Sequence, residues 1–132
     1  MTRSHDPRSS EIEANLARAS DSLQAAELLM QAGHKDAAAS RAYYAAFYAA
    51  TAALLSQGVE FGKHGQVIGA IQRFFVKEGR LSAKQGKDLV WLFELRMLGD
   101  YGETRRVTSE EAARALNSAR EFVEAITHFC EE

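Results

Sequence analysis

Proline is the residue whose distribution most constrains this fold. Pro7 is the only proline among 132 residues, so the chain beyond Arg8 lacks the strongest helix breaker. Alanine is abundant and β-branched residues are few and scattered, and both features favour helix over strand. No segment alternates apolar and polar residues for long enough to indicate a half-buried strand. We therefore predict a flexible tail over residues 1–8 and one all-α domain over residues 9–132.

Glycines and potential capping residues divide this domain into five expected helices. The expected limits, in chain order, are Ser9 or Ser10 to Gly33, Asp36 to Gly58, His64 or Gly65 to Gly79, Ser82 to Gly99 or Gly102, and Thr108 or Ser109 onward. Glu13 follows Ser10 by three residues and Glu111 follows Thr108 by three, which is the spacing of a capping box. Because the links are short, we expect antiparallel neighbours and a compact bundle of four to five helices.

The balance of charged residues argues against two classes of function. The chain carries 16 basic and 18 acidic residues, a net charge of -2, which makes it a poor candidate for coating DNA or binding membranes through a polybasic surface. The single cysteine, Cys130, cannot form an internal disulfide, and no apolar stretch is long enough to span a bilayer. We therefore expect a cytoplasmic protein that does not associate with membranes.

One candidate binding face lies in the second expected helix. Arg41, Tyr44 and Tyr48 recur at spacings of three and four residues, so they share one side of that helix. Tyrosine hydroxyls and an arginine cost free energy to bury unless they find partners. Two interpretations stay open: these side chains line a ligand-binding groove, or they pack into the core with their polar tips satisfied.

Two further groups are candidates for chemistry. Lys63 and His64 stand at the start of the third expected helix, where free backbone N–H groups favour an anion, although His64 could simply cap that helix. Arg96 and Asp100 are four residues apart, but the basic residue comes first, which is the less favourable order for a stabilising pair. Arg96 is therefore a candidate phosphate ligand. No two histidines lie at helical spacing from each other, so we predict neither a metal site nor a cofactor.

These segments together resemble the small stand-alone HEPN-domain proteins of prokaryotes. They read S-R-A-Y-Y-A-A-F-Y-A-A over residues 40–50, K-H-G over residues 63–65 and E-L-R-M-L-G-D-Y over residues 94–101. The resemblance extends from about Glu11 to Phe129 and implies a bundle of four or five helices, often dimeric. It also implies a minimal nucleotidyltransferase as partner, in a toxin–antitoxin or related module. Many members of the family are metal-independent ribonucleases.

Only half of the family's ribonuclease pattern is present. Those members carry an arginine followed a few residues later by a histidine; Arg96 matches the arginine, but Asp100 and Tyr101 follow it. Histidine suits proton transfer near neutral pH, whereas an ionised aspartate is a weak base and cannot donate a proton. His64 could take the histidine's place from another helix. In related toxins the tyrosine just after the motif receives a nucleotide, which makes Tyr101 a candidate for modification.

Three hypotheses follow. In the first, a homodimeric HEPN domain partners a nucleotidyltransferase and holds a nucleotide or an RNA phosphate in a cleft. The side chains expected in that cleft are Arg41, Tyr44, Tyr48, Lys63, His64, Arg96, Asp100 and Tyr101. In the second, the chain is a ribonuclease toxin in which Arg96 stabilises the phosphate and His64 or Asp100 transfers protons. In the third, it is a scaffold whose polar motif residues only maintain the fold.

Overall fold

The computed structural model describes residues 8–131, which form five α-helices, one π-helical segment and no strand. The elements are α1 (Ser9–Gln31), α2 (Lys35–Ser56), α3 (His64–Ile71), the π-helical segment η2 (Gln72–Val76), α4 (Ala83–Tyr101) and α5 (Ser109–Glu131). The prediction of an all-α bundle is confirmed. All of the expected tail except Arg8 lies outside the described residues.

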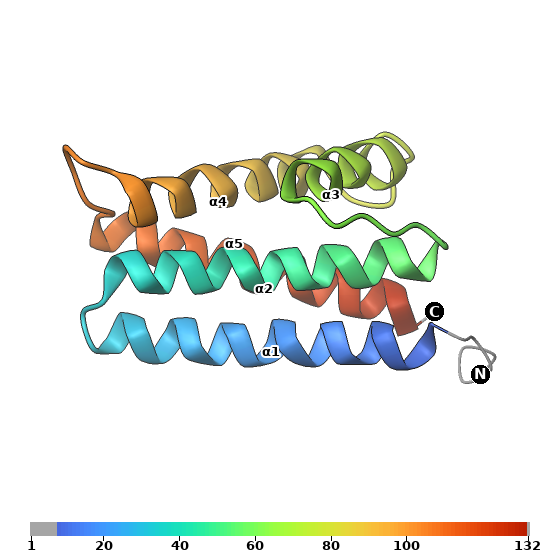
Figure 1. Ribbon diagram of the computed structural model, residues 1–132, viewed down its shortest axis with the longest axis horizontal. Helices are drawn as coiled ribbons and strands as arrows, with labels where there is room; N and C mark the ends of the chain where they lie inside the picture. The colour runs from blue at the N-terminus through green and yellow to red at the C-terminus, as the bar shows by residue number, and fades with distance from the viewer. Residues whose placement is uncertain (1–7, 132) are drawn as a thin grey trace.

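Helix α2 occupies the centre of the bundle. It packs against α1, α4 and α5, while α3 covers the end of the bundle beside the start of α4 (Figure 1). Helices α1 and α4 run opposite to α2, as the short links predict, whereas α5 runs in the same direction as α2 (Figure 1). The start of α1 and the end of α5 therefore lie at the same end of the bundle.

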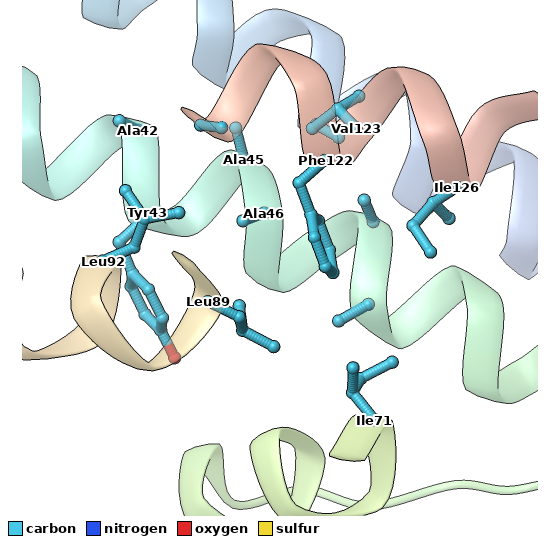
Figure 2. Packing of buried hydrophobic residues seen from close by; sticks show 14 of the residues in the cluster. Ala42, Tyr43, Ala45, Ala46, Ile71, Leu89, Leu92, Phe122, Val123 and Ile126 are labelled. Carbon is cyan, nitrogen blue, oxygen red and sulfur yellow. The ribbon is translucent and has the colours of Figure 1, made fainter. Parts of the chain in front are cut away.

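Small side chains allow these close approaches. Nine alanines of α2 are buried, and they lie between the apolar faces of the neighbouring helices: Ala38, Ala39, Ala42, Ala45, Ala46, Ala49, Ala50, Ala52 and Ala53. Larger residues from other elements fill the space around them, among them Ile71, Leu89 and Phe122 (Figure 2). Helix α2 is therefore buried on most of its circumference, because apolar faces of other helices surround it.

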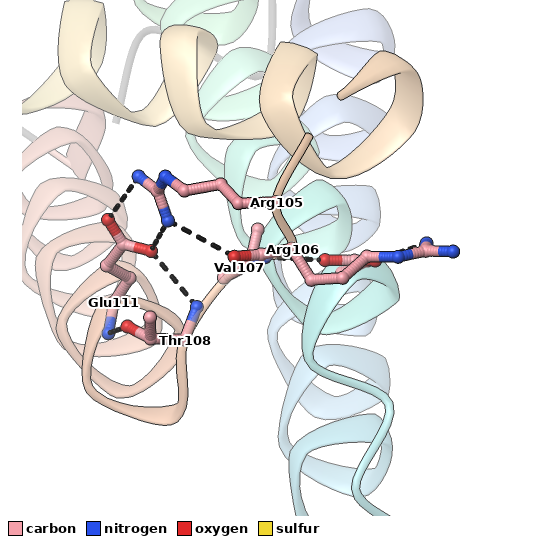
Figure 3. Close-up of polar contacts among 6 residues, drawn as sticks. Arg105, Arg106, Val107, Thr108 and Glu111 are labelled. Carbon is pink, nitrogen blue, oxygen red and sulfur yellow. Dashed lines mark hydrogen bonds and ion pairs between the residues drawn. The ribbon is translucent and has the colours of Figure 1, made fainter. Parts of the chain in front are cut away.

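Several predicted helix ends are confirmed. Gly33, Gly58 and Gly79 all have positive φ angles of 86°, 76° and 80°, which favour glycine at the end of a helix. Ser82 caps α4 in a capping box with Gln85. At the start of α5, Thr108 and Glu111 each accept a hydrogen bond from the other's backbone N–H at 3.0 Å, the second predicted capping box (Figure 3).

Three capping or terminating residues differ from the prediction. Helix α1 begins at Ser9, one of the two predicted starts, but Arg8 rather than a serine is its N-cap and the predicted capping box is not formed. Asp36 lies in the first turn of α2 instead of capping it, because its carboxylate accepts from the Val107 N–H, at 2.9 Å, and binds Arg106. Helix α4 ends at the predicted Gly102 and continues through Gly99: a Cβ at Gly99 would come within 3.2 Å of the Asp36 carbonyl oxygen, so this glycine permits a close approach to α2.

The third expected helix differs in its last turn. The prediction extends one helix from His64 to Lys77, but the chain changes to π-helical hydrogen bonding after Ile71. Gln72 closes this turn through its carbonyl, which accepts from the Lys77 N–H at 2.9 Å, and its side-chain amide donates to the Gly86 carbonyl at 2.9 Å. Segment η2 is thereby attached to the start of α4, and α3 is held in a fixed position at the end of the bundle.

Candidate functional site

Three helices contribute polar side chains to one cluster. Tyr43 projects from the middle of α2 and is fully buried, and its ring extends from α2 past α4 (Figure 2). Its hydroxyl oxygen lies 2.6 Å from Nδ1 of His64, the first residue of α3. The Arg96 guanidinium, from α4, lies 6.0 Å from the centre of the Tyr43 ring. The side chain of Tyr43 is thus close to both the histidine and the arginine.

Aromatic neighbours fix the His64 ring. It stacks on Phe47 with centroids 4.3 Å apart and an interplanar angle of 27°, and the Tyr44 ring meets it edge-on at 5.8 Å. Burial lowers the pKa of His64, and the positive charge of Arg96 lowers that pKa further. The imidazole is therefore neutral at neutral pH. The open question of whether His64 caps α3 is settled: Lys63 is the N-cap, and Nδ1 pairs with Tyr43 instead.

Arg96 is mostly buried and incompletely bonded. Its Nη2 donates to the Tyr44 hydroxyl at 3.0 Å, and its Nε lies 2.9 Å from Oδ2 of Asp100, close enough for an ion pair. The Nε–H is not aligned with that oxygen, however, so among residues 8–131 this buried nitrogen has an ion-pair partner but no hydrogen-bond partner. Nη1 has a sulfur contact with Met97 at 3.8 Å. Guanidinium donors are therefore left over for another acceptor.

A second arginine gives the cluster excess positive charge. The Arg41 guanidinium lies 4.9 Å from the centre of the Tyr44 ring, and that of Arg96 lies 5.3 Å from the same ring. Asp100 pairs with Arg96, but among residues 8–131 Arg41 has no carboxylate partner. Two guanidinium groups around one tyrosine with one carboxylate suit an added anion, because a phosphate can bridge such groups.

The structure brings together six of the eight predicted site residues. They are Arg41, Tyr44, Tyr48, His64, Arg96 and Asp100, linked by the contacts above and by the 6.1 Å separation of the Tyr44 and Tyr48 rings. Lys63 is exposed beside His64 at the N-cap of α3, and Tyr101 is 64% exposed at the end of α4. No contact joins these last two to the cluster within the described part of the chain.

Two members of this cluster were not predicted as site residues from the sequence. Tyr43 and Phe47 fall on the buried stripe of α2, so their spacing indicates core positions, and both do pack against the core. Only the position of α3 makes Tyr43 a hydrogen-bond partner of His64 and Phe47 its stacking partner. The one sequence signal is chemical: a tyrosine on a buried stripe needs a partner for its hydroxyl.

The described residues were also compared with the requirements of a metal site and of a membrane-spanning helix. Within residues 8–131, no group of three histidine, cysteine, aspartate or glutamate side chains is placed to hold a metal ion. No helix in this part of the chain combines the length and the apolar character needed to cross a bilayer.

Comparison with known proteins identifies relatives along most of the chain. The sequence profile of the HEPN domain matches residues 12–129. A UPF0332 protein of Thermotoga maritima is 37% identical over 115 residues, which cover 87% of each chain. A Methanocaldococcus jannaschii protein named as a candidate toxin is 35% identical over 116 residues, 88% of this chain and 86% of its own. A UPF0332 protein of Gloeobacter violaceus is 36% identical over 99 residues, 75% of this chain and 79% of its own.

Proposed function

The chain belongs to the HEPN domain family, and we propose that it is a toxin-like module that binds the phosphate of RNA or of a nucleotide at the cluster around Arg96. The candidate-toxin name of the Methanocaldococcus relative supports the toxin-like part of this proposal. The site would use Arg41 and Arg96 as cations and His64 as a neutral polar group.

One observation carries the proposal: the guanidinium groups of Arg41 and Arg96 lie 4.9 and 5.3 Å from the centre of the Tyr44 ring, and among the described residues Asp100 is their one carboxylate partner. Nη1 and Nη2 of Arg96 each carry two N–H groups and have one contact each, so N–H groups remain for a phosphate oxygen. Phosphate oxygens are strong acceptors for guanidinium groups, and the neighbouring Arg41 adds charge without a carboxylate that would compete. The excess positive charge is local, because the whole chain carries a net charge of -2.

Binding of fluorescein-labelled single-stranded RNA, followed by anisotropy, tests the proposal. A hydrogen bond to a charged group contributes about 1.5–3 kcal/mol, so Arg96→Ala should weaken binding by about 10- to 100-fold. The matched control is Arg18→Ala, which removes the same charge from an exposed position on α1, a helix that does not pack against α4. Equal affinities of the two folded variants would contradict the proposal.

Ribonuclease activity is the second candidate. His64 joins the cluster from α3, so the residue that could replace the missing motif histidine lies near Arg96. Cleavage of a mixed RNA pool in the presence of a chelator tests this candidate. It predicts cleavage that both Arg96→Ala and His64→Ala abolish, whereas RNA that is bound but remains intact would exclude it and leave the binding module.

We further propose that the protein forms a homodimer and that this homodimer binds a minimal nucleotidyltransferase, as the family resemblance implies. The outer side of α4 supports an interaction surface: Val90, Met97 and Tyr101 are exposed at spacings of seven and four residues, on one side of the helix. Light scattering after size-exclusion chromatography measures both assemblies. The proposal predicts a dimer alone and a larger complex with the transferase, and a monomer in both samples would contradict it.

A further inference from the structure

We propose that Tyr43 is a positioning residue that holds the neutral His64 ring in the tautomer with its proton on Nε2. His64 would then present a hydrogen-bond donor to the phosphate. This inference rests on the proposed function, because it assigns a role within the same cluster. The spacing of Tyr43 in the sequence predicts only a core position. Here Tyr43 also determines that Nε2 is the atom of His64 that donates to the phosphate.

The Tyr43 hydroxyl proton points at the His64 ring. Tyr43 has 0% exposure, and burial raises the pKa of its phenol, so the hydroxyl keeps its proton throughout the range in which proteins are stable. Within residues 8–131 its hydrogen-bond partner is His64 Nδ1, at 2.6 Å. A buried donor without an acceptor costs about 1–3 kcal/mol, so this proton must point at Nδ1.

The direction of this proton determines where the imidazole carries its own. Neutral histidine carries one ring proton, and a ring nitrogen accepts a hydrogen bond only when it carries none. If Nδ1 accepts from Tyr43, the ring proton is on Nε2. The opposite arrangement, with an Nδ1 proton donated to the Tyr43 oxygen, would leave the buried hydroxyl proton without a partner. The geometry therefore selects one of the two tautomers.

Nε2 of His64 is accessible to solvent. No hydrogen bond within the described chain involves this nitrogen, yet Arg96 Nε is the one side-chain nitrogen or oxygen there that is both buried and without a hydrogen-bond partner. It follows that Nε2 of His64 reaches solvent. The stacked Phe47 ring and the buried Tyr43 fix the plane of the imidazole, so the Nε2–H is a preorganised donor.

This assignment separates the two candidate functions. A neutral His64 with its proton on Nε2 donates a hydrogen bond to a phosphate oxygen, as Arg96 does. It cannot accept the proton of an RNA 2′-hydroxyl through the same atom, because Nε2 is already protonated. The lowered pKa of His64 also keeps the imidazolium, which would be the general acid, scarce at neutral pH. The inference thus favours binding over cleavage with His64 as base.

Two-dimensional NMR correlating the ring nitrogens and carbon-bound protons of ¹⁵N-labelled, ligand-free protein tests the inference at neutral pH. His64→Gln assigns the signal. In the wild type we expect the chemical shifts of a protonated Nε2 and an unprotonated Nδ1. Tyr43→Phe removes only the hydroxyl and should distribute the proton over both nitrogens, whereas Tyr48→Phe, on the same helix, should leave the wild-type pattern unchanged.

An Nδ1 proton in the wild type, or an unchanged tautomer in Tyr43→Phe, would overturn the inference. If Tyr43→Phe does not fold, the wild-type spectrum decides: a scalar coupling between the Tyr43 hydroxyl proton and Nδ1 supports the assignment, and its absence together with an Nδ1 proton refutes it. Because these spectra contain no RNA, their outcome is independent of the anisotropy result. Failure of the tautomer and failure of RNA binding are therefore distinguishable.

Discussion

Replacing Asp36 by alanine should destabilise the protein by an amount that the structure allows us to estimate. The Asp36 carboxylate joins the start of α2 to the loop before α5, where it accepts from the Val107 N–H and pairs with Arg106. Val107 is 1% exposed, so losing its acceptor leaves a buried N–H unsatisfied, at a cost of about 1–3 kcal/mol. Arg106 is 82% exposed, and its ion pair contributes about 0–1 kcal/mol.

Together these terms predict a loss of about 1–4 kcal/mol for Asp36→Ala. For a chain of 132 residues this lowers the melting temperature by roughly 3–20 °C. Thermal unfolding followed by circular dichroism, beside Asp36→Asn and Arg106→Ala, tests the reasoning. The asparagine keeps an acceptor for Val107, so both comparison variants should lose about 1 kcal/mol or less. Equal losses in Asp36→Ala and Arg106→Ala would refute the role of the buried N–H.

Two further predictions concern the bundle. The guanidinium of Arg105 and then the backbone N–H of Thr108 lower the pKa of Glu111 to about 2, so its contribution to stability is complete above the ordinary value of 4.5 and is lost as pH falls towards 2. Glu111→Gln should therefore cost about 0.5–1 kcal/mol at pH 7 and nothing near pH 2 in unfolding scans, and a gap that is constant with pH would contradict this. Gly86→Ala should cost about 1–3 kcal/mol in urea unfolding, because its Cβ would lie 2.7 Å from Val76 Cγ2. Gly69→Ala, which has open space, should instead gain about 0.4–1 kcal/mol, and the same sign for both would be evidence against a packing effect.

The elements were predictable from the sequence because their signals are local. A positive φ at Gly33 and a serine cap at Ser82 depend on a few neighbouring residues, and both occur where the pattern predicts. The failures involve partners far along the chain. The local sequence predicts Asp36 as an N-cap, but its carboxylate instead accepts a hydrogen bond from the N–H of Val107, 71 residues away. The local sequence predicts a helix end at Gly99, but the glycine is there because the backbone of α2 packs closely against it.

The same distinction applies to the candidate site. The i, i+3, i+7 spacing of Arg41, Tyr44 and Tyr48 correctly predicts side chains that share one side of α2, and the cluster includes all three. Whether His64 meets Arg96 depends on how the loop from Gly58 to Lys63 returns α3 to the bundle. No local pattern specifies that path, so the sequence could name His64 as a candidate but could not give it Tyr43 as a partner.

The proposed function requires a phosphate to bind at the Arg96 cluster. Titration of ¹⁵N-labelled protein with single-stranded RNA, followed through the arginine Nε–H and histidine ring signals, tests this claim at the residues concerned. We expect saturable shifts at Arg96 Nε–H and His64 Nε2, with Arg18 unchanged. Saturable RNA binding that leaves the signals of Arg96 and His64 unchanged, or no binding to any RNA offered, would contradict the claim.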